Sequence, residues 1–157
     1  SYAACLEKFT GKKLSEIPGT GAAGGLGFAF LWGLPNVELK PGIDIVLEAV
    51  GLTNELKDAD VVVTGEGCLD FQTAMGKVPV GVAKIAKNYN CKVIAFAGSV
   101  TEEAKKCNEK GIDAFFSILP GVCSLDEAMD TEIAQKNMRN AAEQVFRLIL
   151  ALYEHKT

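Results

Sequence analysis

Histidine is nearly absent from this sequence, and its scarcity excludes several kinds of active site. The 157 residues contain one histidine, His155, close to the C-terminus. A Ser-His-Asp or Cys-His mechanism needs an imidazole that is held firmly beside the nucleophile, and a frayed terminal residue does not provide one. We therefore expect neither mechanism, and a metal site made of several histidines is excluded.

The cysteines are too scattered to form a recognisable framework. Their number is odd and no CxxC spacing occurs among Cys5, Cys68, Cys91, Cys107 and Cys123, so neither a disulfide scaffold nor a zinc site is indicated. Free thiols of this kind are most simply kept in a reducing cytoplasm. We therefore expect the protein to be cytoplasmic.

Long apolar runs and a strong charge bias are missing as well. The longest apolar run, from Leu148 to Tyr153, covers six residues, whereas a membrane-spanning helix needs about twenty. No stretch shows the pattern of a secretory signal peptide. Sixteen basic residues face twenty acidic ones, for a net charge of −4. We therefore expect no nucleic-acid partner and no binding to an anionic membrane.

The composition that remains is that of a globular protein, with 48% hydrophobic and 23% charged residues. This length predicts one domain, or one domain and part of another. The first residue is not methionine, and residues 1–17 are typical of a helical tail that runs into a loop. We therefore expect the sequence to begin inside a larger protein. The glycine-rich composition changes near residue 50, which predicts one domain part over 1–49 and another over 50–157.

Three short apolar runs alternate with helical patterns in the second half. The helices are predicted from Pro79 onward and over 101–110, and the strands over 60–64, 92–97 and 114–119. This alternation predicts βαβ units with right-handed crossovers and a parallel sheet, and therefore an α/β fold.

Amphipathic spacing predicts which helix faces lie in the core. A helix over 42–50, which Gly51 ends, carries Ile43, Val46, Leu47 and Val50 on one face. The helix that begins at Pro79 carries Val82, Ile85 and Ala86. A capping-box pattern from Ser124 to Glu127 starts a short helix. A long helix over 131–153 has a core-facing stripe of Ala134, Met138, Ala141, Ala142, Val145, Leu148, Ile149 and Leu152.

Polar residues gather directly after the first predicted strand, at the sheet edge where α/β proteins bind ligands. The stretch Gly65–Lys77 is predicted to be a loop, and it contains three glycines together with Glu66, Asp70, Gln72, Thr73 and Lys77. Carboxylates can hold Mg²⁺, and a lysine can meet phosphate. The alternative is a solvated turn that caps its own backbone.

The other candidate stretches carry weaker signals. Gly98-Ser99 follows the second strand and could offer a hydroxyl and backbone amides to an anion, or be an ordinary turn, which we favour. Pro120-Gly121 is interpreted as structural. Cys68 lies in the candidate loop, where we expect it to pack rather than to act as a nucleophile.

A glycine cluster near residue 20 matches GxGxxG at Gly19, Gly21 and Gly24. A dinucleotide fingerprint requires a strand just before it, and residues 14–18 do not form one. A Walker motif is also absent, because Val78 follows Gly76-Lys77. Two interpretations remain: a glycine turn into a tightly packed helix, or a cradle for phosphate or carboxylate at a helix N-terminus.

Several motifs, in the same order along the chain, resemble the bacterial glycerate kinase family of the glyoxylate and glucarate pathway type. They are Gly19-Thr-Gly-Ala-Ala-Gly-Gly-Leu-Gly27, Leu39-Lys-Pro-Gly-Ile43, Thr64-Gly-Glu-Gly-x-x-Asp70-x-Gln-Thr73-x-x-Gly-Lys77-x-Pro-x-Gly-Val-Ala83, Ala97-Gly98, Phe116-Ser117-Ile118 and Pro120-Gly121. The resemblance implies ATP-dependent phosphorylation of D-glycerate, assisted by Mg²⁺. It also implies two α/β domains with the active site between them, one flavodoxin-like and one restriction-enzyme-like. Residues 1–49 would end the second, inserted domain, and residues 50–157 would be the C-terminal part of the flavodoxin-like domain.

The sequence departs from the family pattern in two ways. Cys68 stands where family members usually carry arginine. The family's Asp-Ser-Phe-Lys-Gly and Asp-Val-x-Asn-Pro-Leu segments have no counterpart here. The resemblance therefore implies that the chain is the C-terminal part of a kinase, inactive alone, whose partner is the remainder of its own full-length chain. An oligomer is possible.

Residue type and position suggest individual roles, since phosphoryl transfer depends on positioning and charge neutralisation. We expect Glu66 and Asp70 to be catalytic carboxylates that hold Mg²⁺ or orient the substrate, and Lys77 to be a catalytic phosphate contact. Substrate or phosphate contacts are expected from Gly21, Gly24, Gly25, Gln72, Thr73 and Ser99. The competing functions are a non-catalytic flavodoxin-like module that binds a small anion or a protein partner, and an oligomerisation fragment that uses the long C-terminal helix.

Overall fold

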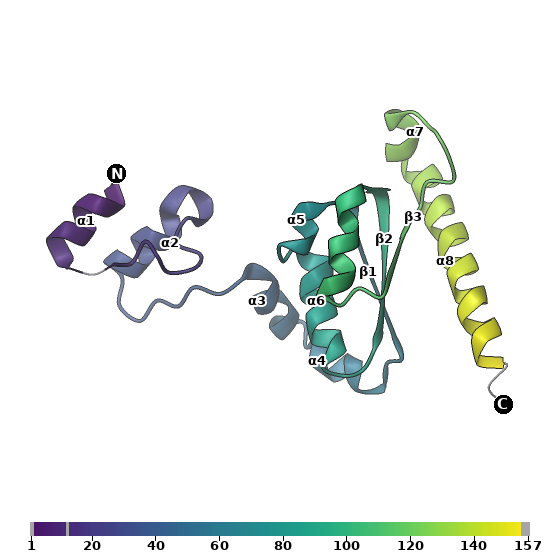
Figure 1. Ribbon diagram of the computed structural model, residues 1–157, viewed down its shortest axis with the longest axis horizontal. Coiled ribbons are helices and arrows are strands. Elements are labelled where there is room, and N and C mark those ends of the chain that lie inside the picture. The colour runs from purple at the N-terminus through teal and green to yellow at the C-terminus, as the bar shows by residue number, and fades with distance from the viewer. Residues whose placement is uncertain (1, 12, 155–157) are drawn as a thin grey trace. The chain divides into compact units, whose positions relative to one another are not determined.

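The computed structural model describes residues 2–11 and 13–154, and the chain divides into two compact units, Ser1–Val46 and Leu47–Thr157 (Figure 1). His155 lies outside the described residues, so the expectation placed on it is not tested. Among the residues that are described, no helix has both the length and the apolar character needed to span a bilayer.

The elements follow one another in the order α1 (Tyr2–Thr10), α2 (Ala22–Gly33), α3 (Gly42–Ala49), α4 (Leu52–Glu55), the 3-10 helix η1 (Leu56–Asp58), β1 (Val61–Leu69), α5 (Phe71–Ala74), α6 (Val78–Lys87), β2 (Lys92–Val100), the 3-10 helix η2 (Glu102–Lys110), β3 (Ala114–Ser117), α7 (Leu125–Met129) and α8 (Thr131–Glu154).

The first unit contains a close approach between a glycine turn and helix α2. A Cβ on Gly27 would lie 2.5 Å from the carbonyl oxygen of Gly19, a distance that only glycine permits at this position. The buried Thr20 holds the same turn, because its hydroxyl donates to the carbonyl oxygen of Ile17 at 2.8 Å. The geometry therefore fits the interpretation of a glycine turn that leads into a tightly packed helix.

Helix α3 ends at a left-handed glycine, as predicted. Gly51 has a φ of +67° and its amide donates to the carbonyl oxygen of Glu48. The predicted core face of this helix is largely wrong, because Leu47 is buried but Val46 and Val50 are exposed. Helical spacing gives the direction of an apolar face but does not say whether a neighbouring element covers it.

Strands β1, β2 and β3 form one parallel sheet in that order, which confirms the predicted parallel α/β arrangement (Figure 1). Val62 of β1 lies opposite Val93 of β2, and Ile94 of β2 lies opposite Ala114 of β3. Because the strands are parallel, their carboxyl ends meet at one edge of the sheet.

The lengths of the strands differ from the prediction. Strand β1 continues to Leu69, so the first five residues of the predicted loop at 65–77 belong to a strand. Strand β2 continues to Val100 and includes the predicted turn at Gly98-Ser99. Strand β3 is shorter than predicted and ends at Ser117. The glycines suggest a loop, but Gly65 and Gly98 serve close approach of the strands instead. A Cβ on Gly65 would lie 2.3 Å from the carbonyl oxygen of Phe96.

Replacing Gly65 by alanine should destabilise the sheet strongly. The added methyl group would force β1 away from β2, and overpacking of this kind costs about 1–3 kcal/mol of unfolding free energy. Gly67→Ala on the same strand is the matched control, because its Cβ would meet nothing within 4 Å; it should leave stability unchanged or raise it by up to about 1 kcal/mol. Urea denaturation checks this, and equal effects of the two substitutions would contradict the close-approach explanation.

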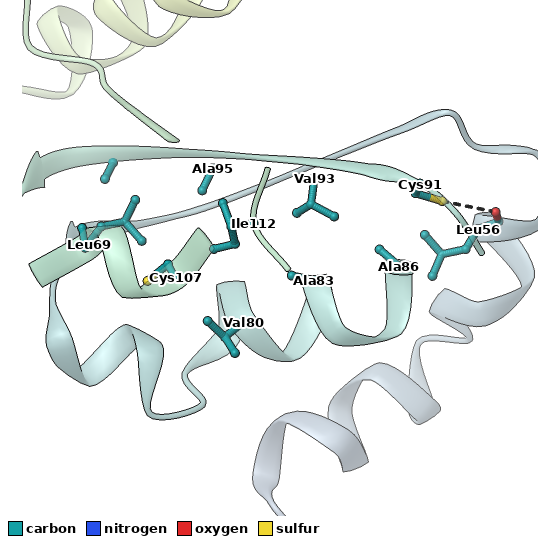
Figure 2. Close-up of a cluster of buried hydrophobic side chains, with 12 residues drawn as sticks. Leu56, Leu69, Val80, Ala83, Ala86, Cys91, Val93, Ala95, Cys107 and Ile112 are labelled. Atoms are coloured by element: carbon teal, nitrogen blue, oxygen red, sulfur yellow. Dashed lines mark hydrogen bonds between the residues drawn. The ribbon is translucent and has the colours of Figure 1, made fainter. Parts of the chain in front are cut away.

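One face of the sheet packs on α6 and η2. Figure 2 shows Val93 and Ala95 of β2 facing Val80, Ala83 and Ala86 of α6, all of them buried. The predicted face of this helix is correct at Ala86 and, in part, at Ile85. Ile85 packs at the margin of this cluster and Val82 is half-buried. The core side is formed instead by small residues three positions apart, which allow the helix to approach the sheet closely.

The opposite face of the sheet packs on the middle of α8. Ile94 and Phe96 of β2 form a buried cluster with Val145 of the helix, flanked by the half-buried Ala141, Ala142 and Ile149. The predicted core stripe is wrong at its remaining large members, since the exposed fractions are 39% for Met138 and 60% each for Leu148 and Leu152. The helical spacing of the apolar residues on α8 is predicted correctly, but the three strands supply apolar partners for only part of this helix.

The capping signals are confirmed. The amide of Glu127 donates to Ser124 Oγ at 3.2 Å and Glu127 Oε2 accepts from the amide of Ser124 at 2.8 Å, which forms the predicted capping box of α7. The predicted helix over 101–110 is the 3-10 helix η2, which is flanked by Thr101 as its N-cap and by Gly111 as its C-cap, with a φ of +104°.

Asp113 fastens the start of β3 to the rest of the sheet. Its Oδ2 accepts from the amide of Val93 at 2.6 Å and from Lys87 Nζ. Partial burial pushes the pKa of Asp113 upwards, but the hydrogen bonds from Lys87 and from the Val93 amide, together with the lysine's charge, outweigh it and hold the pKa below the ordinary value.

This lowered pKa predicts a pH-dependent contribution to stability. Because the pKa of Asp113 is lower in the folded state, its contribution should be fully present above the unfolded value of about 3.9 and be lost as the pH falls through the folded pKa. Asp113→Asn should therefore reduce the unfolding free energy by about 1 kcal/mol at pH 7, and the difference from the wild type should shrink below about pH 4. Denaturation at several pH values, with the exposed Asp126→Asn as control, tests this; a difference independent of pH would contradict it.

Candidate functional site

The candidate site lies where β1 ends and α5 begins, at the carboxyl edge of the sheet. Glu66 is half-buried within β1 and lies opposite Ala97 of β2. Asp70 follows the last residue of the strand and is the N-cap residue of α5. The tertiary structure thus places one carboxylate on the strand and the other on the turn that follows.

Asp70 and Thr73 form a reciprocal capping box. The amide of Thr73 donates to Asp70 Oδ1 at 3.0 Å, and the amide of Asp70 donates to Thr73 Oγ1 at 3.2 Å. Residues with these side chains cap helices through contacts of this kind. The alternative interpretation, in which the segment satisfies its own backbone, is therefore realised for these two residues.

A further bond connects this box to the strand. The hydroxyl of Thr73 donates to Glu66 Oε1, and Thr73 is fully buried with an exposed fraction of 0%. Thr73 thus lies between the two carboxylates that the sequence singles out. Sequence reasoning does not find this contact, since it depends on the continuation of β1 to Leu69.

Lys77 lies close to Asp70 as an ion pair. Its Nζ is 3.7 Å from Asp70 Oδ1, and the side chains are 41% and 24% exposed respectively. The hydrogen bond from the Thr73 amide lowers the pKa of Asp70, and the charge of Lys77 lowers it further. Asp70 is therefore an anion at neutral pH, beside a cation that remains accessible to solvent.

Gln72 and Ser99 are exposed near the same edge. Gln72 lies on α5, between the capping partners, and Ser99 lies in β2 opposite the half-buried Cys68. A groove with a volume of about 420 Å³ runs over the same strands and is lined by Val63, Thr64, Gly65, Glu66, Phe96, Ala97, Gly98, Ile118 and Met138.

Two residues beside these carboxylates escape sequence reasoning. Hydrogen bonds from its own amide and from Thr101 lower the pKa of Glu103, whereas the negative charge of Asp70 acts in the opposite direction. Burial raises the pKa of the Cys107 thiol, and the charges of Glu66 and Asp70 raise it further. Glu103 lies just after β2, and this place in the sequence could have indicated it. Nothing in the sequence points to Cys107.

The glycine cluster forms a separate candidate within the first unit. Ala23, Gly24 and Gly25 all have positive φ, at 50°, 71° and 98°. Gly21, Gly24 and Gly25 contribute, with Thr20 and Phe28, to the lining of a pocket of about 320 Å³. Backbone exposed in this way can approach a ligand closely, because two of the three residues have no side chain.

The donor set suits a cation that is shared with a substrate rather than enclosed by protein. Among residues 2–11 and 13–154, no group of three or more His, Cys, Asp or Glu side chains is arranged to hold a metal ion. Mg²⁺ is commonly bound through one or two carboxylates, with water and substrate phosphates supplying the other oxygens. Glu66 and Asp70, joined through Thr73, fit that donor set.

Comparison with known proteins identifies the family. The model of the glycerate kinase family matches residues 1–150. A glycerate kinase of Bacillus subtilis (strain 168) is 44% identical over 92% of this chain and 38% of its own length, and one of Halalkalibacterium halodurans is 47% identical over 90% of this chain and 37% of its own. A glycerate 2-kinase of Escherichia coli (strain K12) is 45% identical over 81% of this chain and 33% of its own length.

A solved structure supports the same relationship. A candidate glycerate kinase 2 from Salmonella typhimurium LT2 superposes with a TM-score of 0.69 at 40% identity, covering 98% of this chain and 38% of that protein. The chain thus spans less than two fifths of the length of the relatives it matches. The motifs at Gly19–Gly27 and Thr64–Lys77, the parallel sheet and these matches agree, and the chain belongs to the glycerate kinase family.

Proposed function

We propose that this chain forms part of an enzyme that transfers a phosphoryl group from ATP to D-glycerate and yields phosphoglycerate. The observation that supports the proposal most directly is the grouping of Glu66, Asp70 and Lys77 at the carboxyl edge of a parallel sheet, in a chain of this family. Anionic groups that can hold Mg²⁺ and a solvent-accessible cation are the kinds of group that phosphoryl transfer uses for positioning and charge neutralisation.

The roles of these residues follow from their surroundings. Asp70 has a lowered pKa, so it stays ionised at neutral pH and is suited to orient a hydroxyl or a cation rather than to remove a proton. Lys77 keeps about two fifths of its side chain exposed, so its ammonium can turn from Asp70 to a phosphate oxygen. Glu66 and Asp70 are the residues that would hold Mg²⁺, which supplies charge neutralisation for the phosphates.

The remaining contacts are assigned to exposed groups. We place Gln72 and Ser99 as hydrogen-bond partners of the substrate or its phosphate, because both are exposed near the site. The backbone at Gly21, Gly24 and Gly25, which lines a pocket in the first unit, is assigned as a cradle for an anionic group. These assignments rest on residue type, exposure and backbone geometry.

We further propose that residues 50–157 are the C-terminal part of a flavodoxin-like domain and residues 1–49 the end of a second, restriction-enzyme-like domain. The three parallel strands in sequential order support the first assignment. Strand β1 lies at the edge of this sheet, and Val63 on it is 48% exposed. Since parallel sheets are normally covered on both faces and paired on both sides in their centre, the rest of the full-length chain is the partner that we expect at this edge.

The function is tested with the full-length protein. Incubation with ATP, Mg²⁺ and D-glycerate should produce a phosphate monoester whose ³¹P NMR signal distinguishes the 2- from the 3-phosphate. Omission of D-glycerate is the control, since ATP hydrolysis alone gives inorganic phosphate. A protein that is stabilised by ATP in a thermal-shift assay but forms no phosphoglycerate would support the non-catalytic alternative.

A further inference from the structure

The hydrogen-bonding groups of Thr73 are turned to protein partners and are closed to solvent. A threonine hydroxyl carries one proton and can accept further bonds. In this structure the proton is directed to Glu66 Oε1, while the oxygen accepts from the amide of Asp70 at 3.2 Å. The amide of Thr73 donates to Asp70 Oδ1 at 3.0 Å, and the residue is 0% exposed. A ligand in solvent therefore reaches neither the hydroxyl nor the amide.

From these buried contacts we infer that Thr73 is a positioning residue, which holds the carboxylates of Glu66 and Asp70 in one fixed arrangement. The inference rests on the proposed function, in which those two carboxylates do the chemical work. It replaces the expectation that the Thr73 hydroxyl binds substrate or phosphate with a role exerted through its neighbours.

The bond to Glu66 separates this role from ordinary helix capping. A capping box needs only Asp70 and Thr73, three residues apart, and both of its bonds are present. The bond to Glu66 crosses to a residue on β1 that takes no part in the cap. A threonine that served the helix alone would not need this third partner.

The physical need for such a residue follows from the flexibility of glutamate. A glutamate side chain has several rotatable bonds, and fixing it costs conformational entropy. Threonine is branched at Cβ and therefore stiff at χ1, and here it is a buried residue of α5 that pairs with the Asp70 cap. A stiff, buried donor pre-organises the Glu66 carboxylate before the substrate arrives. Such positioning matters, since a displacement of about 1 Å can cost about 100-fold in rate.

Two substitutions separate the hydroxyl from the bulk of the side chain. In the full-length enzyme Thr73→Val keeps the shape but removes both hydroxyl bonds, and it should lower kcat about 30-fold with a change in the KM for D-glycerate below about 3-fold. Thr73→Ser restores the hydroxyl and should keep kcat within about 3-fold of the wild type. Ser124→Ala, which removes the comparable capping box of α7, should leave kcat unchanged.

A double-mutant cycle distinguishes a residue that acts through Glu66 from one that only stabilises the fold, because only the first should lose its effect on kcat when Glu66 is replaced. If Thr73 acts through Glu66, Thr73→Val should lower kcat less than about 3-fold in a Glu66→Gln background, against about 30-fold in the wild type. Equal effects in both backgrounds would overturn the inference, and so would a Thr73→Ser enzyme as slow as Thr73→Val.

A second cycle in the 157-residue chain, with Glu66→Ala in place of Glu66→Gln, keeps the test independent of enzymatic activity. Alanine is used because a glutamine oxygen could still accept from the Thr73 hydroxyl. The urea midpoints of the two single variants and the double variant should be non-additive, because Thr73 and Glu66 share a bond. Additive midpoints would overturn the contact itself. A full-length wild-type protein that makes no phosphoglycerate would instead refute the proposed function, whatever the midpoints show.

Discussion

Asp70→Asn in the full-length enzyme is expected to lower kcat about 100-fold, or about 2.7 kcal/mol of transition-state stabilisation at 1.36 kcal/mol per decade. Asparagine has nearly the same shape as aspartate and is an equally good N-cap residue. Its side-chain oxygen can still accept from the amide of Thr73, the bond that Asp70 Oδ1 makes at 3.0 Å. The substitution therefore removes the charge beside Lys77 while the start of α5 stays capped.

The stability of this variant should change little. The ion pair with Lys77 is 3.7 Å long and partly exposed, and pairs of this kind contribute about 0–1 kcal/mol. Asp70→Ala removes the cap as well, so it should also reduce the unfolding free energy by about 1 kcal/mol and lower the melting temperature. A near-normal kcat and KM for Asp70→Asn, with only a lowered melting temperature for both variants, would show that Asp70 is a capping residue without a catalytic role.

The pH dependence of the defect follows from the direction of the pKa shift. The hydrogen bond from Thr73 and the charge of Lys77 lower the pKa of Asp70, so the carboxylate is fully charged throughout the neutral range. The ratio of wild-type to Asp70→Asn activity should therefore be constant between pH 6 and 8, values above the ordinary aspartate pKa of about 3.9. Steady-state rates at both pH values provide the check.

The 157-residue chain by itself is expected to produce no phosphoglycerate from ATP, Mg²⁺ and D-glycerate. It spans about 38% of the length of its glycerate kinase relatives. Large apolar side chains on the sheet edge and on α8 are also exposed, with exposed fractions of 48% for Val63 of β1 and 60% each for Leu148 and Leu152. We expect the rest of the full-length chain to cover these side chains.

The measurement compares this chain with a longer protein from the same gene at equal concentration. The longer protein should form phosphoglycerate, while the 157-residue chain should not exceed the reaction without enzyme. Robust turnover by the 157-residue chain would contradict the expectation and would assign the complete active site to the residues described here. Inactivity of both proteins would point instead to the non-catalytic alternative.

The sequence by itself determined those features that depend on a few neighbouring residues. Alternating strands and helices, the glycine that ends α3 and the capping box at Ser124 are confirmed by the structure. Each of these signals acts over one or two turns of the chain, because capping bonds and backbone preferences are local. The parallel sheet follows from the alternation alone, since short helical crossovers leave few other arrangements.

The tertiary structure alone decided what depends on distant partners. A glycine suits both a loop and a tight strand contact, and only the approach of Phe96 to Gly65 shows which applies. The stripe on α8 has the right period, but the sheet decides that Val145 is buried and Leu148 exposed. Within the candidate site, the sequence pointed to Glu66, Asp70 and Lys77 by type and place. The bond that joins Glu66 to the cap of α5 through Thr73 depends on how far β1 runs, and strand length is set by pairing with β2, which local sequence does not encode.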